Sequence, residues 1–196
     1  MTESRRGFLA LSASLLITAC ATPPTGERKI DNAPVRSPSE WKGRFSATYT
    51  VPGVPGDDQS ASGRFGLTLR DGAIVLDLST PIGQTIARTQ VGPEGAWLTD
   101  NQGKIYRAAT VETLTEQLFG WRVPLTSLPN WLQGRVSEPS ATEGGRLRSG
   151  TESGWQIRID SWLDEGLVRA IELVWPAQGA VADRRIRLRL FVDAVS

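Results

Sequence analysis

The stretch "RFGLTLRDGAIVLDLS", residues 64–79, indicates the fold class most directly. Apolar and polar residues alternate on both sides of Asp71-Gly72, which is the pattern of strands with one buried face. Asp-Gly between two such runs favours a two-residue type I′ turn. The stretch therefore predicts a β-hairpin with a continuous apolar row on one face. The row consists of Phe65, Leu67, Leu69, Ile74, Leu76 and Leu78.

Strand patterns continue on both sides of this hairpin, and two helix patterns lie between them. Thr110 can cap a helix that stops at Gly120, and Ser127 can cap a second short helix that ends at Gly134. We therefore expect a mainly β fold with α-helices: a curved antiparallel sheet or half-barrel of about nine to eleven strands, with short helices covering one face or end. The other predicted strands cover residues 45–50, 84–91, 96–99, 104–108, 155–159, 168–175 and 185–190.

The only cysteine, Cys20, follows a pair of arginines and an uncharged run of 13 residues, Gly7–Ala19. A bilayer-spanning helix needs roughly 20 apolar residues, so this run fits the apolar region of a signal peptide better. The residues directly before Cys20 resemble the lipobox of bacterial lipoproteins. This resemblance implies removal of residues 1–19 and acylation of Cys20 at its sulfur and its amino group. A short membrane anchor with an incidental cysteine is the alternative.

The export route and the domain organisation follow from the same region. Ser4–Leu9 resembles the twin-arginine export pattern, and both the general secretory and the twin-arginine routes stay open. Residues 20–40 contain four prolines and no apolar periodicity, which predicts a lipidated N-terminus and a flexible tether. Residues 41–196 are long enough for a single domain.

Composition excludes several kinds of site. The chain has no histidine, and lipidation of Cys20 would remove its one thiol, so we expect no zinc site, imidazole base or disulfide. The chain has 22 basic and 21 acidic residues, and 20 of each remain after removal of residues 1–19. This balance argues against nucleic acid as a partner and against a polybasic membrane contact. No motif for a cofactor or a nucleotide is present.

Three arginines, Arg185, Arg187 and Arg189, alternate with apolar residues near the C-terminus. They could bind an acidic ligand, but their spacing is also what a strand with one solvated face requires. We favour the solvated face.

The middle of the chain resembles the LolB family of outer-membrane lipoproteins. The resemblance rests on "WKGRF" at 41–45, Pro81-Ile82-Gly83, the Asp100–Tyr106 hairpin, and "PLTSL" at 124–128 ahead of Trp131-Leu132. It implies a half-barrel around an apolar cavity, closed on one side by helices, and no cofactor. It also implies a receptor, anchored through Cys20 at the periplasmic face of the outer membrane, that accepts triacylated lipoproteins from the periplasmic carrier LolA. The cargo then passes into the phospholipid of the inner leaflet. We expect a monomer.

An acyl-chain cavity needs apolar lining with few polar groups, because unpaired polar groups beside lipid chains are costly. The apolar row of the hairpin could supply this lining, together with Trp97, Leu114, Leu118 and Trp131. The same residues could also fill an ordinary core, and the pattern alone leaves both possibilities open.

The "TPIG" stretch, residues 80–83, suits a turn, with Pro81 at the second position and Gly83 at the fourth. Ile82 is then at the tip, where a polar residue is usual. The family resemblance implies that this position is an exposed apolar residue that contacts the membrane and is needed for release. The alternative is an Ile82 that folds back into the core.

An outer-membrane lipoprotein hydrolase is the alternative function. It would use carboxylates, of which Asp77, Asp160, Asp164, Glu165 and Glu172 are the candidates. No pairing motif connects them, so we expect no catalytic residues and no enzyme.

Overall fold

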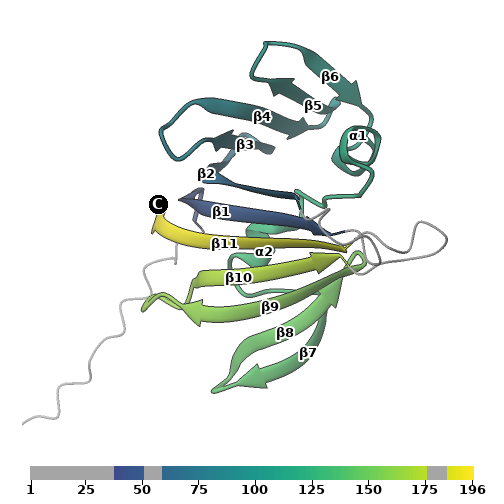
Figure 1. The fold of residues 1–196 in the computed structure, drawn as a ribbon. Coiled ribbons are helices and arrows are strands. Elements are labelled where there is room, and N and C mark those ends of the chain that lie inside the picture. The colour runs from purple at the N-terminus through teal and green to yellow at the C-terminus, as the bar shows by residue number, and fades with distance from the viewer. Residues whose placement is uncertain (1–37, 51–58, 176–184) are drawn as a thin grey trace, which may run out of the picture. The chain divides into compact units, whose positions relative to one another are not determined.

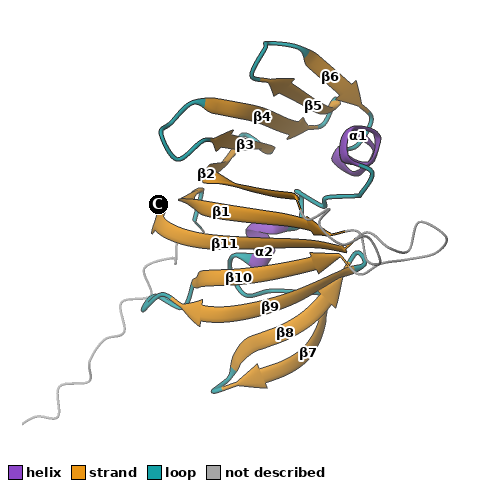
Figure 2. Ribbon diagram, viewed as in Figure 1, coloured by secondary structure: helices purple, strands orange, loops and turns teal. Residues whose placement is uncertain are grey.

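The computed structural model describes residues 38–50, 59–175 and 185–196. In this part of the chain eleven strands form one antiparallel sheet, in the order β6-β5-β4-β3-β2-β1-β11-β10-β9-β8-β7 (Figure 1). The strands are β1 (Glu40–Thr50), β2 (Gln59–Arg70), β3 (Ala73–Ser79), β4 (Thr85–Gly92), β5 (Gly95–Asp100), β6 (Ile105–Ala108), β7 (Glu138–Glu143), β8 (Arg146–Glu152), β9 (Trp155–Trp162), β10 (Val168–Trp175) and β11 (Arg185–Val195). The helices α1 (Val111–Phe119) and α2 (Leu128–Trp131) are short (Figure 2). The predicted fold class, an open curved antiparallel sheet with short helices, is confirmed.

The hairpin predicted from residues 64–79 is formed by β2 and β3. Phe65 pairs with Leu78, and Leu67 pairs with Leu76, so the apolar residues of both strands share one face. Asp71 and Gly72 have φ values of 52° and 77°, and positive φ at both central residues defines a type I′ turn.

We call the face with this apolar row the inner face and the opposite one the outer face. The strand register continues the inner face through Phe45 of β1 and Leu190 of β11 to Ile171 of β10 and Ile159 of β9. The buried residues of these strands and of both helices form one hydrophobic core. The core therefore lies along the inner face of the sheet from β6 to β8.

Close packing on this face explains the glycine in "WKGRF". A Cβ atom at Gly43 would lie 2.8 Å from the ring of Phe65 and 2.0 Å from the carbonyl oxygen of Phe191. Gly43 pairs with Phe65 across the strands, so the missing side chain makes room for the aromatic ring.

The two helices begin differently. Thr110 caps α1 as predicted, because its hydroxyl accepts the Thr113 N–H, and Gly120 ends the helix in the left-handed region. Ser127 was expected to cap α2 and does not, since its own backbone is already helical and its side chain makes no capping hydrogen bond. The helix begins at Leu128, and Pro129 occupies its second position, where its fixed φ suits the first turn.

The helices cover different parts of the inner face. Helix α1 contacts β5 and β6. The α2 region is fastened to the other half of the sheet, where the Val168 N–H donates to the Leu132 carbonyl at 3.1 Å and the Trp155 indole N–H donates to the Arg122 carbonyl at 2.9 Å.

The sequence did not predict the β7–β8 hairpin. Every residue of β7 is exposed, so the strand has no buried face to produce an alternating pattern. It is an edge strand, where Pro139 is tolerated because one row of N–H groups points away from the sheet.

Candidate functional site

Nine of the ten residues predicted to line a cavity pack within or against the inner-face core. Phe65, Leu67, Leu114 and Trp131 are buried. Leu69, Ile74, Leu76, Leu78 and Leu118 are only partly buried and pack against that core. All seven residues of β3 are partly exposed, although this strand lies in the interior of the sheet. The inner side of β3 is therefore covered less completely than that of β2.

The tenth residue, Trp97, was placed on the wrong face. It pairs with Gln90 of β4, and Gln90 pairs with Val75 of β3, so all three lie on the outer face. The indole N–H of Trp97 donates to the Gln90 side chain. Leu98 occupies the inner position and is buried. The prediction failed because a one-residue shift in strand register reverses the face of every side chain.

The inner face contains few polar groups. Among the described residues, the buried polar or charged ones are Thr89, Thr115 and Glu172, and Glu172 belongs to the outer face. The hydroxyl of Thr115 both donates to the Glu112 carbonyl and accepts the Val123 N–H. The indole N–H of Trp41 is buried with no hydrogen-bond partner in the described part of the chain. This composition suits apolar ligands.

The Thr80–Gln84 turn between β3 and β4 is held by three hydrogen bonds. The Thr80 N–H donates to the Gln84 carbonyl at 2.8 Å, and the Gly83 N–H donates to the Thr80 carbonyl at 2.9 Å. The Gln84 N–H donates to the Thr80 hydroxyl at 3.0 Å. Ile82, at the tip, is 82% exposed and is the most exposed large apolar residue of the described chain. It does not fold back into the core.

The Asp100–Lys104 turn between β5 and β6 is closed by the same pattern of three hydrogen bonds. The Asp100 N–H donates to the Lys104 carbonyl at 3.0 Å, and the Gly103 N–H donates to the Asp100 carbonyl at 3.1 Å. The Lys104 N–H donates to the Asp100 carboxylate at 3.0 Å. Gly83 and Gly103 have φ values of 89° and 80°. The two turns differ at the tip, where Gln102 takes the place of Ile82.

Asp100 adds an electrostatic feature to its turn. Partial burial of the carboxylate acts to raise the pKa of Asp100, but hydrogen bonds from the N–H groups of Lys104 and Gln102 and from the Tyr106 hydroxyl, with the Lys104 charge, outweigh it. The pKa therefore lies below its ordinary value. The pattern of Thr or Asp followed three residues later by Gly is visible in the sequence, but the equivalence of the two turns was not recognised from it.

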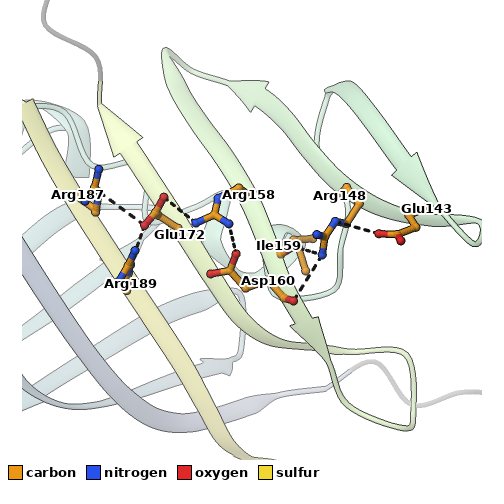
Figure 3. Close-up of polar contacts among 8 residues, drawn as sticks. All are labelled: Glu143, Arg148, Arg158, Ile159, Asp160, Glu172, Arg187 and Arg189. Atoms are coloured by element: carbon orange, nitrogen blue, oxygen red, sulfur yellow. Dashed lines mark hydrogen bonds and ion pairs between the residues drawn. The ribbon is translucent and has the colours of Figure 1, made fainter.

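The outer face carries an ionic cluster around Glu172 (Figure 3). Its carboxylate accepts hydrogen bonds from Arg189 at 2.7 Å and Arg158 at 3.0 Å, and Arg187 lies 3.6 Å away. Burial acts to raise the pKa of Glu172, but these hydrogen bonds and charges outweigh it and lower the pKa. The side chains of Arg187 and Arg189 are about half exposed and Arg185 is exposed, as the interpretation of a solvated sheet face predicted.

Of the five carboxylates that a hydrolase could use, only Asp160 and Glu172 come close together, and both are ion-pair partners of Arg158. Asp77 forms a two-pronged pair with Arg88, and Asp160 pairs with Arg158 on the other half of the sheet. Asp164 and Glu165 are exposed in the β9–β10 turn. Within residues 38–50, 59–175 and 185–196, no group of three metal-ligating side chains comes together. No helix in those ranges is long and apolar enough to span a bilayer. Cys20 lies outside the described residues.

Comparison with known proteins identifies the family. The family model for the outer membrane lipoprotein LolB matches residues 39–194. The outer-membrane lipoprotein LolB of Cupriavidus necator is 32% identical over 201 residues, covering 98% of each chain. Those of Cupriavidus taiwanensis and Azoarcus sp. strain BH72 are 33% and 31% identical, covering 96% and 98% of this chain and 90% and 97% of their own. The chain therefore belongs to the LolB family, whose members are outer-membrane lipoproteins that localise other lipoproteins and are not enzymes.

Proposed function

We propose that this protein accepts an acylated lipoprotein from a LolA-type carrier, holds its acyl chains against the inner face, and releases them into the phospholipid of the outer membrane. It works as a monomer anchored through Cys20. Family membership supports the cargo and the carrier. The inner face supports the binding step, because it is apolar and incompletely covered at β3.

The exposed Ile82 is the observation that carries the release step. An isoleucine at 82% exposure costs free energy in water, and its turn does not require it, because the equivalent Asp100–Lys104 turn has Gln102 at the tip. Transfer of one isoleucine into an apolar medium contributes about 1.5–3 kcal/mol. That is too little to anchor a protein and enough to orient a tethered one.

Direct passage of acyl chains explains why such a tip is useful. Each CH₂ group that enters water costs about 0.8 kcal/mol, so a chain that leaves the protein through water meets a high barrier. An apolar tip in the membrane interface brings the binding face and the bilayer together. Pro81 and Gly83 keep the tip in place, Pro81 through its fixed φ and Gly83 through its positive φ.

A two-step assay tests this proposal. Lipoprotein is transferred first from the carrier to this protein and then from this protein to liposomes. Ile82→Glu should leave the first step unchanged and slow the second at least tenfold, with cargo stalled on the protein, because a carboxylate is poorly soluble in the interface. Ile82→Leu should deliver nearly normally. Phe191→Glu is the matched control, since it places the same charge at an exposed apolar residue on β11, away from this turn.

Delivery by the Ile82→Glu variant at the wild-type rate would show that this turn is not the insertion device. The binding step has its own test in Leu76→Glu, which places a carboxylate on the inner face. This variant should accept less lipoprotein, because an unpaired buried carboxylate costs several kcal/mol or must take up a proton. Normal acceptance by a folded Leu76→Glu variant would show that acyl chains bind elsewhere.

A further inference from the structure

Lys104 and the edge strand β6 that follows it, Ile105–Ala108, have an unusual surface. Ile105 is 53% exposed, second only to Ile82 among the exposed large apolar residues of the described chain. It lies on the outer face, because it pairs with Thr99 next to the outward-facing Trp97. Ile105 does not belong to the hydrophobic core or to the residues packed against it.

Prevention of pairing between this edge strand and other chains explains the two cations, Lys104 and Arg107, but not Ile105. Exposed lysine and arginine on an edge strand discourage pairing with other chains, and Lys104 and Arg107 fit that role. An exposed isoleucine between them works against it. Residues 101–109 contain these two cations and no carboxylate, so the strand offers positive charge and apolar surface together.

The β5–β6 turn lies at the same end of the sheet as the turn of Ile82. Strands β3 to β6 are consecutive antiparallel neighbours, so the β3–β4 and β5–β6 turns leave the sheet on the same side, away from α1 (Figure 1). Across the strands they are two strand spacings apart, about 10 Å, and the β3–β4 turn extends further along the strands, because Asp100 is level with Ala87 while Thr85 still pairs with Ser79. Both turns are closed by the same set of backbone hydrogen bonds, so their positions are well defined.

The charges at this end favour an anionic surface. The Asp100 carboxylate is occupied by the N–H groups of Gln102 and Lys104, and Asp77 is paired with Arg88. The Lys104 ammonium lies 4.7 Å from the centre of the Tyr106 ring and is exposed. Tyr106 pairs with the inward-facing Leu98, so the cation and the ring lie on the inner side of this edge strand and Ile105 lies on its outer side. Lysine and tyrosine are side chains that prefer the boundary between headgroups and acyl chains.

We infer that Lys104 and Ile105 form a second membrane-contact surface, which binds the headgroup region of an anionic phospholipid bilayer while Ile82 is inserted. This inference rests on the proposed function. With one apolar tip in the membrane the domain can still rotate about that tip, whereas a second contact at the neighbouring turn fixes its orientation. The inner face then meets the bilayer in one defined pose.

Site-specific quenching tests this surface on the full-length protein anchored in vesicles. Lipidation blocks Cys20, so Ile82→Cys, Ile105→Cys and Phe191→Cys each introduce a single thiol for an environment-sensitive fluorophore. The vesicles consist of phosphatidylethanolamine and phosphatidylglycerol with brominated acyl chains. Phe191 is the control, because it is 41% exposed on β11, where its ring lies beneath Arg44. The probes at 82 and 105 should be quenched and the probe at 191 should not.

The outcomes separate this inference from the proposed function. Quenching at 82 alone overturns the second contact and leaves the insertion turn standing. Quenching at 105 alone would show that β6 contacts the membrane without insertion of Ile82, which overturns the proposed insertion turn and the two-point contact. Quenching at neither position overturns both.

Delivery kinetics give an independent test. Ile105→Glu should slow delivery to these vesicles about fivefold, a smaller effect than at Ile82, because only half of the Ile105 side chain is free to enter the interface. Ile105→Leu keeps an apolar side chain and should deliver at nearly the wild-type rate. Lys104→Gln should slow delivery about fivefold with phosphatidylglycerol present and have no effect on neutral vesicles. If Ile105→Glu slows acceptance from the carrier instead, the surface docks the carrier and the inference is overturned.

Discussion

The Thr80–Gln84 and Asp100–Lys104 turns are closed by the same pattern of hydrogen bonds, but one has an apolar tip and the other a polar tip. In both, the first residue bonds twice to the fifth, and a glycine with positive φ holds the fourth position. The tip is Ile82 in one turn and Gln102 in the other. Because a turn closed in this way accepts Gln102 at its tip, the fold does not demand Ile82. An apolar residue that a turn does not need is more informative about function than a buried one, which packing alone explains.

The turns also differ in the group that closes them. A neutral hydroxyl of Thr80 accepts one backbone N–H, whereas the Asp100 carboxylate accepts two and lies 3.4 Å from the Tyr106 hydroxyl. The first turn is therefore insensitive to pH, and the second depends on an ionised group.

Exchange of the two tips gives the largest expected effect. Ile82→Gln should slow delivery to liposomes about tenfold, because the transfer free energy of one isoleucine is lost. Adding Gln102→Ile should recover part of the rate, since an apolar tip then lies on the neighbouring turn at the same end of the sheet. Both variants should keep the wild-type free energy of unfolding within about 0.5 kcal/mol. If the exchanged protein delivers no better than Ile82→Gln, the position of the tip relative to the inner face matters as well as its apolar surface.

Substitution of Gly83 and Gly103 tests whether the two turns have equivalent backbone conformations. Gly83→Ala and Gly103→Ala should each lower the free energy of unfolding by about 1–2 kcal/mol, because a Cβ atom disfavours positive φ. A Cβ atom would meet no other atom within 4 Å at either site, so the cost comes from the backbone alone. Denaturation in urea measures it. Clearly unequal losses would mean that the two backbone conformations are not the same.

Removal of the closing side chains should have a smaller effect. Thr80→Ala deletes one acceptor and should cost about 0.5–1.5 kcal/mol of unfolding free energy. Asp100→Ala deletes the acceptor of two backbone N–H groups and should lower the urea midpoint further than Thr80→Ala does. An equal or smaller shift for Asp100→Ala would contradict the greater role of the carboxylate.

The smallest effect is a titration confined to one turn. The pKa of Asp100 is lowered in the folded protein, so its stabilisation is complete above the pKa of an unfolded aspartate and disappears as the pH falls through the lower folded value. The amide resonances of Gln102 and Lys104 should therefore shift with a midpoint below that of a free aspartate, while those of Gly83 and Gln84 stay constant. A midpoint at or above the ordinary value of about 4 would show that the hydrogen bonds to Asp100 are not maintained in solution.

Local sequence patterns predicted the elements that have one buried face. The β2–β3 hairpin, its Asp71-Gly72 turn and the capped helix α1 follow from alternation and from short-range hydrogen bonding. The β7–β8 hairpin was missed because β7 has no buried face, and the Ser127 cap was wrong because a short helix with a proline in its first turn can begin without one.

The sequence by itself determined the fold class, the family and the turn that presents Ile82, because periodicity and turn chemistry act over a few residues. Only the tertiary structure decided which residues share a face and which turns share an end, since both depend on the register between strands distant in sequence. Trp97 was therefore assigned to the inner face although it lies on the outer one, and the match between Thr80–Gln84 and Asp100–Lys104 went unseen. Pairing of the strands brings the two turns to one end of the sheet, and a local pattern contains no information about that arrangement.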